Sequence, residues 1–285
     1  MGSDFDRMYY QTLGIVFNGG KGSGNHAPGQ GRGVGKPSNS VKISSGQPSW
    51  RPSVKIENHL SFINKKAKST STEYLRICDK DGNLLIDKKG DKNHVSFHLT
   101  DEEIQDTVSS HNHPTKEIDS TFSYLDIEQF SKGMKQTRAV TKNVIFSLTD
   151  IGDSSTKKIR LSKLAEDFYK RFGNHLRSEV VMERYEPKDY EKYKDFESKV
   201  KRKFVEMKKE YERKMKTGLP FYTETFLRSS YNELEQFKKD SLSQLNKMKL
   251  QTQRKAYRKY NDAKIDFLNN SLNYGIEFRI DRNNS

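Results

Sequence analysis

From residue 190 onward, apolar side chains recur every three or four positions, which is the spacing of one face of an α-helix. The first run stops before Gly218-Leu219-Pro220, where glycine and proline interrupt a helix. A second run continues the pattern over residues 224–270. The sequence therefore predicts two long amphipathic helices packed antiparallel, as a helical hairpin or coiled coil. The apolar positions of the two runs are Tyr190, Tyr193, Phe196, Val200, Phe204, Met207, Tyr211, Met215, Tyr231, Leu234, Phe237, Leu242, Leu245 and Met248.

This helical part also carries most of the positive charge. From residue 155 to the end there are 32 Lys/Arg and 20 Asp/Glu, a net charge of +12 out of +14 for the whole chain. A positive surface favours a polyanionic partner. Acidic residues are interspersed, however, which is typical of a solvated helix face rather than a dedicated DNA clamp. We expect weak DNA binding without sequence preference as a secondary property, and helix packing as the main role.

Several protein classes are excluded by composition. Only 32% of the residues are hydrophobic, so the chain cannot bury all its residues in one compact core. The single cysteine, Cys78, excludes an internal disulfide and a Cys-rich zinc ribbon. The sequence has no apolar run long enough for a membrane span, so none is expected. The opening residues MGSDFDRMYY do not resemble a secretory signal, so we expect a reducing cytosol or a particle assembled there.

Composition divides the chain into four regions. Eight of the 18 glycines lie between Gly19 and Gly35, in a stretch that cannot offset its chain entropy by burial. The predicted regions are an N-terminal segment (1–17), a flexible Gly/Ser/Pro-rich linker (18–52), a compact α/β domain (53–160) and a basic amphipathic helical domain (161–285).

The sequence pattern of residues 53–160 predicts a small mixed sheet with flanking helices. Turn residues Asp81-Gly82-Asn83 separate two short apolar runs, which is typical of a β-hairpin. Ser123 and Asp126 have the spacing of a helix cap, as do Thr100 and Glu103. The predicted strands are 74–78, 84–86, 95–99, 107–111, 138–141 and 144–148, and the predicted helices begin at residues 101 and 123.

The residues that can carry chemistry lie in Ser110-His111-Asn112-His113-Pro114 and in Ser123-Tyr124-Leu125-Asp126. Two imidazoles and one carboxylate are the protein ligands of many catalytic zinc ions, which keep the fourth position for water. Zinc lowers the pKa of that water towards about 7. A further carboxylate must then move the proton to the leaving group.

These residues resemble the JAMM/MPN+ metallopeptidase superfamily, whose pattern is an upstream Glu, His-x-His-Pro and Ser-x-x-Asp. The His-Asn-His-Pro form is most similar to RadC-like proteins and bacteriophage JAB-like domains. The resemblance covers about residues 70–150 and implies a JAMM-type, cytidine-deaminase-like fold. It implies zinc on His111, His113 and Asp126, with Glu73 as general acid/base and Ser123 as oxyanion stabiliser.

Plainer interpretations of the same residues remain open. Ser123 and Asp126 can simply cap a helix, and this is compatible with a role in a site. Glu73 can be a solvated carboxylate at the start of a strand. The loop between the second histidine and Ser123 is longer than is usual in the family, and Asp119 within it is an alternative ligand. His98 is predicted to be a surface residue.

A second resemblance lies in the linker. Gly-Gly-Lys-Gly-Ser-Gly-Asn-His (residues 19–26) resembles a segment of phage head-morphogenesis and minor structural proteins. Two functions follow as expectations. One is a virion-associated metallopeptidase that cleaves a peptide or isopeptide bond. The other is a structural or ejected virion protein, in which the JAMM-like domain is a scaffold and the basic helices bind DNA or other virion subunits (capsid, portal or core). Either would be found in the virion, and in the host cytoplasm during assembly.

Overall fold

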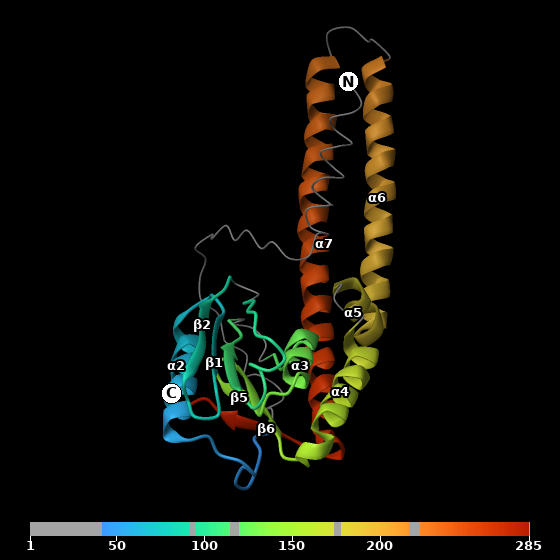
Figure 1. Ribbon diagram of the computed structural model, residues 1–285. Helices are drawn as coiled ribbons and strands as arrows, with labels where there is room; N and C mark the ends of the chain where they lie inside the picture. Colours follow the sequence, from blue (N-terminus) through green and yellow to red (C-terminus); the bar gives the residue numbers. More distant parts are fainter. Residues whose placement is uncertain (1–41, 92–94, 115–119, 174–177, 217–222, 285) are drawn as a thin grey trace.

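The computed structural model describes residues 42–91, 95–114, 120–173, 178–216 and 223–284. One six-stranded sheet with its covering helices forms one end of the molecule, and two long helices project from it (Figure 1). The predicted α/β class is confirmed. Residues 1–17, most of the predicted linker and Gly218–Pro220 lie outside the described residues.

The sheet is mixed, with strand order β2-β1-β3-β4-β5-β6. Strands β3 and β4 run parallel, and every other neighbouring pair is antiparallel. The predicted hairpin at Gly82, whose φ is +79°, forms between β1 and β2. The strands are β1 (Tyr74–Cys78), β2 (Leu84–Lys89), β3 (Val108–Asn112), β4 (Gln136–Val140), β5 (Val144–Asp150) and β6 (Ile276–Arg282).

The predicted strand at 95–99 is wrong. Its alternate residues Val95, Phe97 and Leu99 are half-buried against the core, but the segment forms no ladder with the described strands. The alternation therefore reports burial of one side of an extended segment, not hydrogen bonding. The helix expected after Thr100 is also absent: its capping bonds with Glu103 form, but residues 101–106 are turns.

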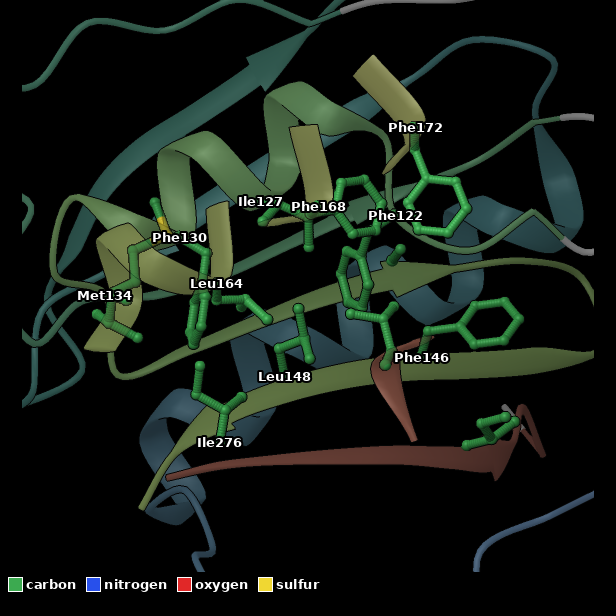
Figure 2. Packing of buried hydrophobic residues seen from close by; sticks show 14 of the residues in the cluster. Phe122, Ile127, Phe130, Met134, Phe146, Leu148, Leu164, Phe168, Phe172 and Ile276 are labelled. Atoms are coloured by element: carbon green, nitrogen blue, oxygen red, sulfur yellow. The ribbon is translucent and has the colours of Figure 1, made fainter. Parts of the chain in front are cut away.

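Helices cover both faces of the sheet. On one face α2 (Val54–Ser69) buries Ile56, Leu60 and Ile63. The sequence interpretation missed this helix, although its apolar residues have helical spacing. The other face carries α3 (Tyr124–Ser131) and α4 (Lys157–Phe168). Between them and the sheet lies the main core, which includes Phe122, Phe130, Phe146, Leu148, Leu164 and Ile276 (Figure 2).

The last strand comes from the end of the chain. Residues 161–285 were expected to be helical, but β6 lies beside β5, pairing Asp150 with Ile276. Ile276 and Ile280 are buried, which explains why this segment joins the sheet. The end of the predicted linker is also packed: Ser44 donates its backbone N–H to the Ile280 carbonyl at 2.8 Å. The helical part is thus inserted between two neighbouring strands.

The projecting helices are α6 (Pro187–Lys216) and α7 (Thr223–Leu268), with α5 (Ser178–Tyr185) packed at their base. Their antiparallel arrangement follows from contacts at both ends. Near the sheet Asp189 pairs with Lys255, and near the far end Tyr211 contacts Tyr231. We call α6 and α7 the helical hairpin.

Every helix among the described residues is too short or too polar to cross a membrane.

Candidate metal centre

His111 lies in β3 at the centre of the sheet, and His113 follows the strand. The strand pairing continues past Asn112, because the backbone N–H of His113 donates to the Val140 carbonyl at 2.7 Å. Residues two apart in extended backbone point to the same side. The two rings therefore converge, with their Nε2 atoms 2.9 Å apart.

Glu73 is brought to the histidines by the residue between them. The side chain of Asn112 accepts the backbone N–H of Tyr74 at 2.6 Å and donates to the Thr72 carbonyl at 3.0 Å. These two bonds tie the residues on either side of Glu73 to β3, while the backbone of Glu73 itself bonds Asp91 and Gly90. One ligand atom from each of Glu73, His111 and His113 lies within 4.8 Å of the others. The three can hold a metal ion.

Asp126 reaches the same place from the first turn of α3. Its Oδ1 lies 3.3 Å from Nε2 of His111, and its Oδ2 lies 3.9 Å from Nε2 of His113. The capping box is also formed: Oδ2 accepts the Ser123 N–H at 2.6 Å, and Ser123 Oγ accepts the Asp126 N–H at 3.2 Å. Asp126 therefore caps α3 and also lies beside the two histidines.

Comparison with protein-family models, with curated proteins and with solved structures finds no match for this chain. The site must be judged on its own geometry.

Electrostatics separates the roles of the four groups. Burial raises the pKa of Glu73 to about 7, against the lowering effect of His111. Burial lowers the pKa of His113 to about 4, and the neighbouring charge of His111 acts in the same direction. Burial opposes charge on Asp126 and His111 as well, but their mutual attraction wins: it lowers the pKa of Asp126 and raises that of His111. At neutral pH His113 is thus a neutral potential ligand, and Glu73 can gain or lose a proton.

A divalent cation fits this group of atoms. Oε2 of Glu73 is buried and has no hydrogen-bond partner among the described residues. Nδ1 of His113 lies 2.8 Å from the Ser120 carbonyl, so it must carry a proton, which leaves the Nε2 lone pair available. A buried polar atom that lacks a partner is costly, and a metal ion held at the histidines would offset that cost.

The cluster opens into a cleft of about 400 Å³. Ser123 lines it, and so do apolar side chains from the 95–97 segment and α3. Among the described residues that line the cleft none is Lys or Arg, although the buried Lys264 ammonium lies close enough to act on Asp126 and His113. The residues that line it outside the cluster include Leu75, Val95, Phe97, Ser109, Leu125, Gln129, Met134 and Thr137.

Asp119 and His98 are the remaining residues that the sequence analysis named near the motif. Asp119 lies outside the described residues, and His98 is exposed as expected. The sequence interpretation missed Asn112 as the residue that fixes Glu73, although it stands inside the motif. It also missed Asn261 and Lys264 of α7, which bond the loop before Ser123. No local pattern marks these two, because their partners lie about half the chain away.

Proposed function

We propose that this protein is a zinc-dependent peptidase or isopeptidase of the JAMM/MPN+ type. The observation that carries the proposal is the convergence of two imidazole Nε2 atoms, 2.9 Å apart, with the carboxylates of Asp126 and Glu73. His111, His113 and Asp126 would hold the metal, as the resemblance implies, and Glu73, which also lies within reach of both histidines, would carry the proton. Zinc supplies a Lewis acid and a water of lowered pKa when bound.

The chain's own residues supply the proton transfer. Burial beside the histidines raises the pKa of Glu73 to about 7 in the metal-free fold, and a carboxyl in this place can accept a proton and later release it. Its backbone is held by Asn112 and does not depend on a metal for its position.

Ser123 is placed to stabilise developing negative charge. Its Oγ accepts the Asp126 N–H, so the hydroxyl proton remains available for donation into the cleft that Ser123 lines. A tetrahedral intermediate of peptide hydrolysis carries such a charge on oxygen. The apolar residues around Ser123 favour an extended peptide with an uncharged side chain beside the bond to be cleaved.

Metal content is the first test. Purified protein should hold about one zinc per chain, and His111→Ala or His113→Ala should abolish it. His98→Ala is the matched control, because His98 is exposed and does not line the cleft. Zinc retained in the His111/His113 double variant would exclude this site.

Peptide cleavage is the second test. Glu73→Gln should keep zinc and lose cleavage of peptide or lysine-isopeptide substrates by about 10²-fold or more. Loss of zinc in this variant would make Glu73 a ligand. Unchanged cleavage would refute its role as general acid/base.

The helical hairpin favours the second candidate function, a structural or ejected virion protein. It projects away from the sheet (Figure 1). Many of its Lys and Arg side chains are exposed. In this case the hairpin would pack as a coiled coil and bind DNA or other virion subunits. The resemblance of residues 19–26 to phage structural proteins supports this candidate. Zinc binding without any cleavage, together with stable binding to a virion protein, would favour this function.

A further inference from the structure

The helical hairpin is joined to the candidate metal centre by two buried side chains at the base of α7. Oδ1 of Asn261 accepts the backbone N–H of Thr121 at 2.9 Å. Nζ of Lys264 donates to the Phe122 carbonyl, also at 2.9 Å. Asn261 is 7% exposed and Lys264 is 6% exposed. The backbone of residues 121 and 122 is therefore hydrogen-bonded by side chains of α7, about 140 residues further along the chain.

The residue before them holds a histidine of the centre. The carbonyl of Ser120 accepts the Nδ1–H of His113 at 2.8 Å. A hydrogen bond of this kind fixes both the tautomer and the orientation of a histidine ligand, and its removal commonly weakens metal binding 10–100-fold. The position of the Ser120 carbonyl depends on the backbone of 121 and 122, because they are consecutive residues.

The choice of residues at the base of α7 supports a positioning role. Burying an ammonium group is costly, and a methionine or leucine would fill the same space without that cost. The Lys264 ammonium contacts the ring of Tyr260 at 5.0 Å and the Phe122 carbonyl. The hydrogen bond of Lys264 acts on the segment that leads into Ser123 and α3, and its charge also attracts Asp126.

We propose that Asn261 and Lys264 are positioning residues, through which α7 sets the orientation of His113 and the zinc affinity of the centre. The proposal rests on the zinc site of the proposed function. It gives the helical hairpin a part in the site: α7 is one continuous helix from residue 223 to residue 268, and its base completes the support of a ligand.

Zinc affinity tests the proposal in the full-length chain. Asn261→Leu and Lys264→Met should each weaken zinc binding by about 10–100-fold, measured by competition with a chelator. Asn261→Asp keeps an acceptor oxygen for Thr121 and should stay close to the wild type. Lys249→Met and Ser241→Ala are the controls, because both residues are buried on α7 away from the centre and should leave the affinity unchanged.

The tautomer of His113 gives a readout that a purely structural role would not change. In metal-free wild-type protein, nitrogen NMR should show the proton on Nδ1, whereas Lys264→Met and Asn261→Leu should show a mixture of tautomers. Folded variants with unchanged affinity and an unchanged tautomer would overturn the proposal. If wild-type protein binds no zinc, the proposed function fails, and the tautomer measurement still decides the role of α7.

Discussion

The two ends of the molecule are built in different ways. At the sheet, side chains from strands, α3, α4 and the base of α7 form one continuous core. Along the helical hairpin, burial is divided among small groups, such as Phe204 with Leu234 and Tyr193 with Val200 and Leu245. Because apolar burial is the main stabilising term, the sheet end should hold the fold, and the hairpin should be the less stable part.

The largest effect should come from the sheet core. Phe146→Ala removes a fully buried ring and should lower the free energy of unfolding by about 4 kcal/mol. Phe204→Ala in the hairpin should cost about half as much, because its cluster contains few other buried side chains and can close around the loss. Denaturant unfolding of the two variants measures the difference, and equal costs would contradict the comparison.

The next effect should come from Asn112. Asn112→Ala leaves the Tyr74 N–H and the Thr72 carbonyl without their buried partner, which should cost about 3 kcal/mol. Glu73 keeps its own backbone bonds to Asp91 and Gly90 but loses its tie to β3, so cleavage should fall beyond the loss of stability. Asn64→Ala, which removes a buried Asn from α2 away from the centre, is the control. Full activity in a folded Asn112→Ala protein would show that the Asn112 side chain does not position Glu73.

The third prediction concerns pH. The pKa of Glu73 is raised from 4.5 to about 7 in the metal-free fold, so its contribution to stability is present below about pH 4.5 and is lost as pH rises through 7. In the presence of a chelator, Glu73→Gln and wild type should be similarly stable at pH 5. At pH 8 the variant should be more stable by about 2 kcal/mol. A constant difference between pH 5 and pH 8 would contradict the raised pKa.

The smallest effect should come from the hairpin surface. Lys255 and Asp189 form an ion pair of 2.6 Å, but Lys255 is largely exposed and solvent screens the attraction. Lys255→Ala should leave the denaturation midpoint within experimental error of wild type. A clear loss would mean that ion pairs, and not the small apolar groups, hold α6 to α7.

The same contrast explains how far the sequence could be interpreted. The bounds of α6 and α7 were predicted to within a few residues of the structure, because a helical stripe is a local pattern. The joint role of His111 and His113 was predicted from the resemblance to a known motif, and their convergence arises because extended backbone continues through His113. The supporting contacts of Asn261 and Lys264 could not be predicted, since nothing near them in the sequence indicates the loop that they bond. The return of β6 was missed for the same reason, and the alternation at residues 95–99 was mistaken for a strand because burial alone can produce it.

The pairing of β5 with β6 has a consequence for synthesis of the chain. A ribosome completes β5 and must then make all of α4 to α7 before residues 276–282 emerge. During that interval the edge of β5 has no neighbour and is open to pairing with other chains. Asn261 and Lys264 also emerge late, so the support of His113 is among the last parts to form. A nascent chain that stops in the helical hairpin would therefore have its histidines without the bonds from Asn261 and Lys264, and would gain the complete centre only after the base of α7 has been made.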